Sequence, residues 1–585
     1  MVLKNKFKNL KDCLDNSSIY DVYYNSQLDE NLIYFESRNG RDFTGNIFRI
    51  IEEISTGNYG EFKIHVFVTP AVKSKINILK KNYNLKITKL ITDEKEAIKS
   101  LEKAKYIFTD SGIQSKYIKK EGQIFVNTWH GTPLKTMGFN NVSEIITLGH
   151  IQHSLLSADY LIYPNEYMAN KMINAYMIDK IYPGKILFEG YPRNSIFFDN
   201  NHRLNLKNTL NLNQKEIFVY MPTFRGILSN LENVKQKDDV EDYLSQLDLK
   251  LTENQILLVK LHAYNESKID FNNFNHIKPF PKGYETYEIV NLADVLITDY
   301  SSVFFDFANT RRKIIIFNYD EEDYLSYRGV YFPLSDLPFP KVRTVDELAD
   351  ELNSEKNYDD TAFINKFCTF DNPKAVKNIC RHILNRENIS KETQIRNENP
   401  NILIFAGPLQ DDEITDNLIN MLNNADRKNY NFFITFNPWD KNIKGNYATI
   451  FTKFPQGVEF LPFRSNLYPT FDEKLDYNKY FKSNNMKITD SLKKLFKRSF
   501  DKQYENVNFE FVIDFYGLNL NSLLILENSD TNRVVWVHNN PKNTDLNMNI
   551  LQEIYSNYDL VIVNSQDLVD DVSSISNRHD NIEVW

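Results

Sequence analysis

Short apolar runs alternate with longer amphipathic stretches along nearly the whole chain, and this alternation constrains the fold more than any other feature. The runs are continuously apolar, which is typical of strands in parallel sheets that helices cover on both faces. The predicted strands are Leu32–Phe35, Ile64–Val68, Tyr106–Thr109, Ile124–Val126, Tyr160–Tyr163, Ile186–Phe188, Ile217–Met221, Ile256–Leu261, Val295–Thr298, Ile314–Phe317, Ile402–Phe405, Phe432–Phe436, Phe509–Ile513, Val534–Val537 and Leu560–Val563.

These runs fall into three series, which we interpret as three units. Residues 28–200 and 201–385 each hold one series, so we expect two doubly wound, Rossmann-like α/β domains that face a cleft. The polar segment Arg386–Pro400 lacks strong periodicity and ends in proline, which predicts a linker. The alternation restarts over residues 401–585, which predicts a third Rossmann-like α/β unit that stops without a matching fourth.

The composition excludes several classes of protein. The 585-residue chain has a formal net charge of −9, which argues against a general nucleic-acid binder. Its three cysteines are too few and too scattered for a disulfide framework or a cysteine zinc site, and they fit a reducing, cytoplasmic setting. No run of about 18 apolar residues is present, so no membrane-spanning helix is expected.

Two basic stretches are amphipathic. The first lies in residues 1–27, a segment predicted to be helical, and its apolar face consists of Leu3, Phe7, Leu10 and Leu14. The apolar face of the second consists of Leu492, Leu495, Phe496 and Phe500. Such helices can lie on an anionic membrane surface or dock on their own domain, and the sequence leaves both alternatives open.

A histidine follows a predicted strand in the stretch Asn127–Gly138, NTWHGTPLKTMG. Gly131 relieves the backbone after His130, and Thr132–Pro133 can supply the N-cap and first residue of a helix. The imidazole would then lie at the carboxyl edge of a sheet, where α/β proteins bind ligands. A histidine there could accept a proton from a hydroxyl group near pH 7, and a structural histidine held in a turn is the alternative.

Two further stretches carry polar groups at strand ends. In Leu257–Tyr264, the side chains of Lys260 and His262 project from one face, with a strand-edge charge and core packing as the respective alternatives. In Asp299–Ser302, DYSS, a strand runs into an apolar helix. The serine hydroxyls and free amides of its first turn could hold a pyrophosphate, although simple N-capping would also explain the serines.

Two arginines also follow predicted strands. Arg193 stands in GYPRN and Arg225 stands in YMPTFR. A guanidinium at such a strand end could bind phosphate in a bidentate manner, and a structural salt bridge is the competing interpretation for each.

In the order WHGTPLK, GYPRN, YMPTFR, VKLHAY and ADVLITDYSSVFFDFA, these motifs closely resemble the CDP-glycerol glycerophosphotransferase family of teichoic-acid and capsule polymer enzymes. The resemblance covers about residues 28–385 and implies the GT-B fold, two Rossmann-like domains with the active site between them. It implies transfer of glycerol phosphate from CDP-glycerol, or of ribitol phosphate from CDP-ribitol, to a hydroxyl of a lipid-linked glycan acceptor. CMP is released, and the polymer is built at the inner face of the bacterial membrane.

The resemblance also implies roles for individual residues. His130 would be the general base on the acceptor side, and His262 would contact the donor pyrophosphate or stabilise the leaving phosphate. The groups that would hold the donor phosphates are Ser301, Ser302 and, as a weaker candidate, Arg225. Further candidates are Lys260, Asp299 and Arg193. The sequence departs from many relatives at Ala263, where they have proline, and Asp306 could be functional or support its helix.

The third unit more loosely resembles the amino-terminal half of a GT-B glycosyltransferase, through PNILIFAGPL, VVWVHNNP and YDLVIVNSQD. In that family the donor-binding residues lie in the carboxyl half, so this unit is expected to be incomplete and to hold no full second active site. His538 is similar to the acceptor-side histidine of such enzymes, with core packing as the alternative.

Two other functions stay open. One is a nucleotide-sugar glycosyltransferase or epimerase, which would consume a UDP-sugar. The other is a membrane-docked assembly scaffold without turnover, which the set of His, Ser and Arg residues disfavours. Residues 201–385 contain no Asp-x-Asp motif, so no metal or other cofactor is required, although magnesium could assist the diphosphate.

Overall fold

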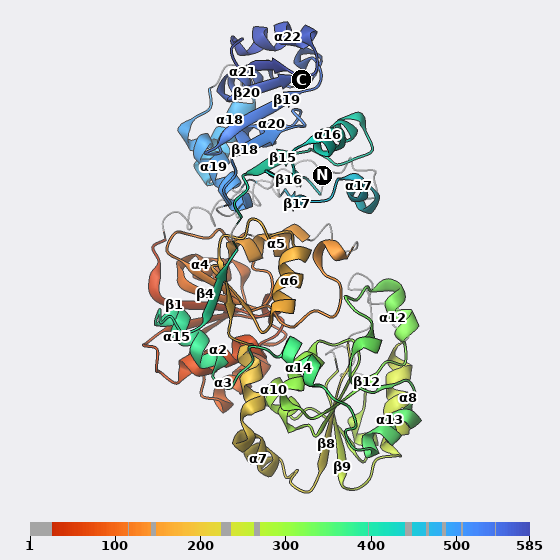
Figure 1. Cartoon of the computed structure of the whole chain (residues 1–585). Helices are drawn as coiled ribbons and strands as arrows, with labels where there is room; N and C mark the ends of the chain where they lie inside the picture. Colours follow the sequence, from red (N-terminus) through yellow and green to blue (C-terminus); the bar gives the residue numbers. More distant parts are fainter. Residues whose placement is uncertain are drawn as a thin grey trace, which may run out of the picture.

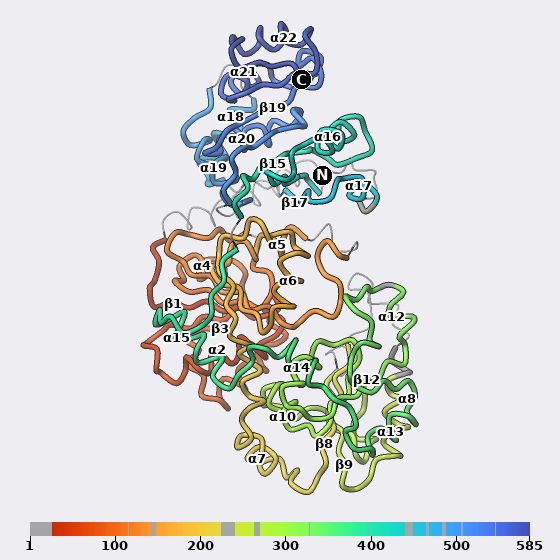
Figure 2. Tube along the Cα trace, viewed as in Figure 1, coloured from red at the N-terminus to blue at the C-terminus, as the bar shows by residue number. Residues whose placement is uncertain are grey.

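A computed structural model describes residues 26–585 except 115, 142–147, 224–235, 262–268, 396, 439–446, 464–466, 468, 483–486, 505–506 and 545. The described chain forms three sheets in succession (Figure 1). The same path is drawn as a trace in Figure 2, where the first two sheets lie in the lower part and the third lies above them. The chain is therefore an α/β protein built on several parallel sheets.

The first sheet has the strand order β14-β7-β6-β5-β4-β1-β2-β3. Its strands are β1 (Asp29–Glu36), β2 (Lys63–Phe67), β3 (Ile87–Ile91), β4 (Ala104–Thr109), β5 (Ile124–Asn127), β6 (Tyr160–Tyr163), β7 (Lys185–Phe188) and β14 (Lys391–Gln394). All pairs are parallel except β14 with β7. The connections contain α2 (Asn46–Ser55), α3 (Lys73–Asn82), α4 (Glu94–Lys103), α5 (Leu148–Ser157), α6 (Glu166–Ala175) and the 3-10 helices η1 (Arg38–Gly40), η2 (Gly138–Asn140) and η4 (Pro192–Phe198).

The second sheet has the order β10-β9-β8-β11-β12-β13, and all its pairs are parallel. Its strands are β8 (Glu216–Met221), β9 (Gln255–Val259), β10 (Ile277–Pro279), β11 (Val295–Thr298), β12 (Lys313–Phe317) and β13 (Lys341–Val342). The helices around it are α7 (Asn200–Thr209), α8 (Gln236–Asp248), α10 (Thr286–Leu292), α11 (Val303–Phe307), α12 (Glu321–Tyr327), α13 (Val345–Asn353), α14 (Thr361–Phe367), η5 (Phe271–Asn273), η6 (Ala308–Thr310) and η7 (Leu334–Asp336).

The third sheet has the order β17-β16-β15-β18-β19-β20-β21 and is parallel throughout. Its strands are β15 (Asn401–Phe405), β16 (Asn431–Phe436), β17 (Val458–Pro462), β18 (Phe511–Asp514), β19 (Asn532–Val537), β20 (Leu560–Val563) and β21 (Ile582–Val584). Its helices are α16 (Glu413–Asn424), α17 (Tyr447–Lys453), α18 (Phe471–Lys482), α19 (Asp490–Tyr504), α20 (Leu520–Glu527), α21 (Met548–Asn557), α22 (Gln566–Ser576) and η8 (Pro541–Asn543).

Each sheet is buried on two faces, as the continuous apolar runs predict. In β1, Ile33 and Phe35 enter one apolar cluster, whereas Leu32 and Tyr34 enter another. Successive side chains of a strand point to opposite faces, so the two clusters lie on the two sides of the sheet. In each sheet the strand order also reverses beside its first strand, and the carboxyl ends at such a switch point are where open α/β sheets bind ligands.

The prediction that Arg386–Pro400 is a linker is wrong for part of this segment. Four of its residues form β14, which pairs with β7 of the first sheet. The preceding helix α15 (Ala375–Leu384) also packs into the first unit, where Ile379 and Ile383 join the apolar cluster on α2. The polar composition hid this strand because β14 is an edge strand with exposed side chains. The chain thus returns to the first unit before the third begins.

The second basic amphipathic stretch docks on its own unit. Its four apolar residues lie in α19 and are buried in the core of the third unit. The domain-docking alternative is therefore confirmed for this helix, and a membrane-facing role for its apolar face is wrong. The other stretch, in residues 1–27, lies outside the described residues. Every helix in the described part of the chain is too short or too polar to span a bilayer.

The third unit packs against two parts of the first unit, namely helix α5 and the connection between β6 and β7. The Gln152 side chain in α5 donates a hydrogen bond to the carbonyl oxygen of Phe460 in β17, at 2.9 Å. Lys180 forms an ion pair of 2.5 Å with Glu459. Apolar side chains from both units belong to one continuous buried cluster.

Candidate active site between the first two units

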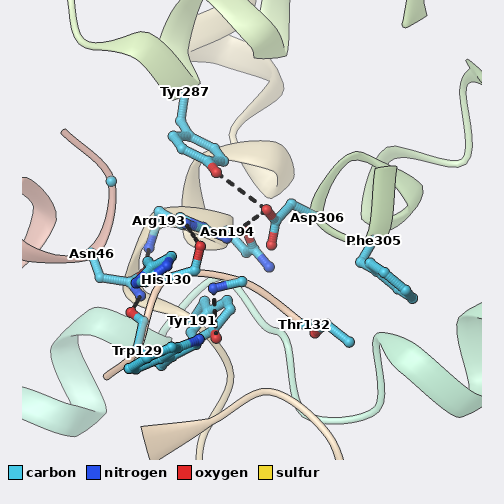
Figure 3. Close-up of polar contacts among 12 residues, drawn as sticks. Asn46, Trp129, His130, Thr132, Tyr191, Arg193, Asn194, Tyr287, Phe305 and Asp306 are labelled. Carbon is cyan, nitrogen blue, oxygen red and sulfur yellow. Dashed lines mark hydrogen bonds and ion pairs between the residues drawn. The ribbon is translucent and has the colours of Figure 1, made fainter. Parts of the chain in front are cut away.

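His130 lies just beyond the carboxyl end of β5, in a backbone held by side-chain hydrogen bonds (Figure 3). Trp129 adopts a left-handed conformation with φ 51°, which is uncommon for a residue other than glycine. The Asn127 carboxamide oxygen accepts the Trp129 amide at 2.8 Å, and the Asn46 carboxamide donates to the Trp129 carbonyl at 3.1 Å. The indole then stacks on the imidazole, with ring centroids 4.6 Å apart. The His130 ring is therefore pre-positioned.

The hydrogen bonding of His130 determines which ring nitrogen carries the proton. Nδ1 lies 2.6 Å from the backbone carbonyl oxygen of Asp110. Because a carbonyl oxygen can only accept, Nδ1 must donate, and Nε2 of the neutral ring keeps its lone pair. Burial lowers the pKa of His130 well below its usual value, and the positive charge of Arg38 lowers it further. The ring is thus a neutral base at physiological pH.

Gly131 brings the first unit into contact with the second. Its φ is 155°, and a Cβ atom at this position would lie 2.4 Å from the Ser302 hydroxyl oxygen. Only glycine permits so close an approach, because a larger residue would displace Ser302. The Gly131 amide donates to the Tyr191 hydroxyl at 3.1 Å, which fixes the turn. Two of the sequence-predicted residues, His130 and Ser302, are therefore neighbours.

Ser301 and Ser302 connect β11 to the short helix α11. Ser302 is the N-cap residue, but its side chain makes no capping hydrogen bond. Neither serine hydroxyl is bonded to another described residue, and both side chains are half-buried. Simple capping therefore does not explain Ser302, and both hydroxyls remain available to a ligand.

Arg193 is buried and neutralised by a carboxylate of the second unit (Figure 3). Its guanidinium lies 2.6 Å from the Asp306 carboxylate and donates to the His130 carbonyl at 3.1 Å. The guanidinium also lies against the rings of Tyr191 and Tyr287, at 4.8 and 4.7 Å from their centroids. The salt-bridge interpretation thus accounts for Arg193, whose charge joins the two units and is not open to phosphate.

The second unit gathers other candidates at its carboxyl edge. The buried Asp299 carboxylate accepts the Thr223 amide at 2.8 and 3.1 Å, so it shapes the turn after β8. Lys260 follows the neighbouring strand β9, and its amide donates to the Tyr220 carbonyl at 2.9 Å. Arg225 and His262 lie outside the described residues, so the predicted approach of the two histidines stays a prediction.

Sequence reasoning missed several residues that build this site. They are Arg38, Asn46, Asp110, Tyr191 and Tyr287. Two of them could have been found from their positions in the sequence. Arg38 and Asp110 come just after β1 and β4, in the same way that His130 comes after β5. Among the described residues, no three His, Cys, Asp or Glu side chains gather in a way that could hold a metal ion.

Comparison with known proteins places this geometry in context. The model of the family "CDP-Glycerol:Poly(glycerophosphate) glycerophosphotransferase" matches residues 18–385. A teichoic acid poly(glycerol phosphate) polymerase of Bacillus spizizenii is 29% identical over 393 residues, which cover 61% of this chain and 92% of that protein. A teichoic acid glycerol-phosphate transferase of Staphylococcus aureus is 27% identical over 415 residues, 65% of this chain and 100% of that protein.

A solved structure shares the fold of part of this chain. The wall teichoic acid polymerase TagF superimposes with a TM-score of 0.53 at 23% sequence identity, over 66% of this chain and 96% of that one. The matched share corresponds in extent to the first two units rather than to all three.

Proposed function

The chain belongs to the CDP-glycerol:poly(glycerophosphate) glycerophosphotransferase family, and we propose that it transfers glycerol phosphate or ribitol phosphate from the CDP-activated donor to a hydroxyl group of a lipid-linked acceptor. The product is a teichoic-acid or capsular polymer longer by one unit, together with CMP. The observation that carries the proposal is the neutral His130 base in contact, through Gly131, with the unbonded Ser302 hydroxyl.

The chemistry follows from these groups. The acceptor oxygen attacks the donor phosphorus that bears the polyol, and its proton passes to Nε2 of His130. The bond from that phosphorus to the bridging oxygen breaks, and CMP leaves with this oxygen. The protein forms no covalent bond with the substrate in this step. Catalysis therefore depends on alignment of the acceptor oxygen with the donor phosphorus and on groups that stabilise the negative charge of the transition state.

The donor side is assigned to the second unit. Ser301 and Ser302 hold the diphosphate, Arg225 supports them, and His262 stabilises the leaving phosphate. Lys260 and Asp299 shape the same edge. The first two units thereby form a GT-B pair with the reaction between them, and the enzyme acts at the cytoplasmic face of the bacterial membrane. Several anchoring contacts already join these units, including the Arg193–Asp306 ion pair.

A panel of activated donors tests the proposal. We expect CMP release from CDP-glycerol or CDP-ribitol only when a lipid-linked polyol-phosphate acceptor is supplied. Measurement of CMP by chromatography, with and without acceptor, checks this. Consumption of a UDP-sugar with neglect of both CDP-polyols would contradict it and favour a glycosyltransferase.

The lowered pKa of His130 predicts the pH dependence of the reaction. A histidine acts as a base only when it is unprotonated, and a lowered pKa keeps it unprotonated to a more acidic pH. We therefore expect kcat/KM to stay level from about pH 8 down to 6.5, the ordinary histidine pKa, and to fall only below it. An acidic limb centred at or above that value in the pH–rate profile would argue against His130 as the base.

A further inference from the structure

A strained segment follows β1 at the same sheet edge as His130. Arg38 and Asn39 both adopt left-handed conformations, with φ of 48° and 55°, and Gly40 follows with φ 74°. The carbonyl of Gly40 accepts the Thr69 amide at 2.7 Å, and a Cβ atom on Gly40 would lie 2.9 Å from the Phe67 ring. The surrounding structure therefore fixes this segment in a conformation that residues other than glycine rarely adopt.

One buried residue fixes both this segment and the catalytic base. The Asp110 carboxylate accepts the Ser37 hydroxyl at 2.7 Å and the Arg38 amide at 2.9 Å. The backbone carbonyl of the same residue accepts Nδ1 of His130 at 2.6 Å. Because both sets of contacts are made by Asp110, the start of the Arg38 side chain is placed at a constant position relative to the His130 ring.

The Arg38 guanidinium has no ion pair within the described part of the chain, and the residue is exposed. The nearby arginines differ in this respect, since Arg193 is paired with Asp306 and Arg49 is paired with Glu288. Burial lowers the pKa of His130, and the charge of Arg38 is close enough to lower it further. Burial raises the pKa of the Asp110 carboxyl, and the same charge opposes that rise. A positive charge without an ion-pair partner among the described residues thus stands beside the base.

The strand order places this charge on the side of the base away from the serines. Along the sheet edge, β5 lies between β1 and β7. Arg38 follows β1, whereas Ser302 meets Gly131 beside Arg193, which follows β7. Neighbouring strands are about 4.8 Å apart, so the ends of β1 and β5 are separated by about 10 Å, a span that an arginine side chain can partly cover.

We propose that Arg38 binds the phosphodiester group of the acceptor polymer that lies next to the hydroxyl to be extended. This inference rests on the proposed function, in which Ser301 and Ser302 hold the donor phosphates. A guanidinium matches the two free oxygens of a phosphodiester, and the fixed distance from His130 positions the terminal hydroxyl at the base. Arg38 would make the enzyme prefer an acceptor that already carries a polyol-phosphate unit.

A binding experiment tests this without turnover. Calorimetry measures the binding of a short glycerol-phosphate oligomer to the full chain in the absence of any CDP-activated donor. We expect Arg38→Gln to weaken this binding about tenfold and Arg38→Lys to weaken it less, because lysine keeps the charge but not the planar fork. Arg41→Gln, at an exposed arginine of the same segment, is the matched control and should bind as the wild type does.

Kinetics with two acceptors then locates the contact. Where the enzyme turns over, Arg38→Gln should raise KM for a phosphodiester-bearing acceptor and leave KM for the CDP-polyol unchanged. An acceptor whose terminal hydroxyl lies on a neutral linker should show no such penalty. The inference fails if the wild type does not bind the oligomer, if Arg41→Gln weakens binding equally, or if only the donor KM rises. If the wild type binds the oligomer but releases no CMP from any CDP-polyol, the proposed function fails while the binding role of Arg38 stands.

Discussion

Replacement of His130 by alanine is expected to lower kcat about a thousandfold, within the range typical for loss of a general base. The imidazole is neutral, and its Nε2 lone pair is free to accept the proton of the acceptor hydroxyl. The fold should persist, because the ring is half-buried and its polar contact is a single hydrogen bond to a backbone carbonyl. CMP release with saturating donor and acceptor measures the loss, and thermal unfolding checks the fold.

The third unit offers a matched control for this variant. His538 occupies an equivalent place in its own sheet. Asn127 of β5 pairs with Thr109, the last residue of β4, and His130 lies three residues after Asn127. Val535 of β19 pairs with Asp514, the last residue of β18, and His538 lies three residues after Val535. Its Nε2 is 2.6 Å from the carbonyl oxygen of Phe515, and its Nδ1 is 3.2 Å from the Asn564 carboxamide. Both ring nitrogens are thus engaged, so His538→Ala should retain near-normal turnover. Normal turnover in His130→Ala, or equal loss in both variants, would reject the assigned role of His130.

Replacement of Arg193 by alanine is expected to destabilise the protein by about 3–5 kcal/mol, because it leaves the buried Asp306 carboxylate without its partner. Burial already raises the pKa of Asp306, and Arg193 opposes that shift. Without Arg193 the folded-state pKa of Asp306 should rise further above its unfolded value. The folded state then favours the protonated acid, so the penalty is present at high pH and shrinks as pH falls through the raised pKa. Denaturant unfolding at several pH values measures both effects.

Two companion variants sharpen this result. Asp306→Asn added to Arg193→Ala removes the unpaired charge and should recover part of the lost stability. Lys63→Ala breaks the exposed ion pair with Asp29 and should cost no more than about 1 kcal/mol. Equal, small costs for Arg193→Ala and Lys63→Ala would show that the buried pair is not a principal contact between the units.

The central strands could be predicted from the sequence, but most edge strands could not. A central strand is buried on both faces and is therefore continuously apolar, as in Ile314–Phe317. At the edges, β3 contains exposed Thr88 and Lys89, β10 has three residues, and β14 is largely polar. Such strands form because a neighbour offers its unpaired backbone groups, and this depends on the sheet rather than on the local sequence.

The candidate site shows the same division. His130 and Ser302 were found because each stands at a strand end within a recognisable motif. The contacts that hold them could not be predicted, since Asn46 is 147 residues from Arg193 and Arg193 is 113 residues from Asp306. Whether Arg193 met a phosphate or a carboxylate depended on which distant side chain the fold brought near. The local sequence was compatible with either.

The single apolar cluster that spans the first and third units has a mechanical consequence. Leu155 and Leu461 belong to the same cluster, so separation of these units would expose apolar surface to water on both of them. The first and third units are therefore expected to move as one rigid body. A change in the separation of the first two units would then be a movement of the second unit relative to that body. Removal of the third unit would therefore expose the apolar side chains of the first unit that now pack against it.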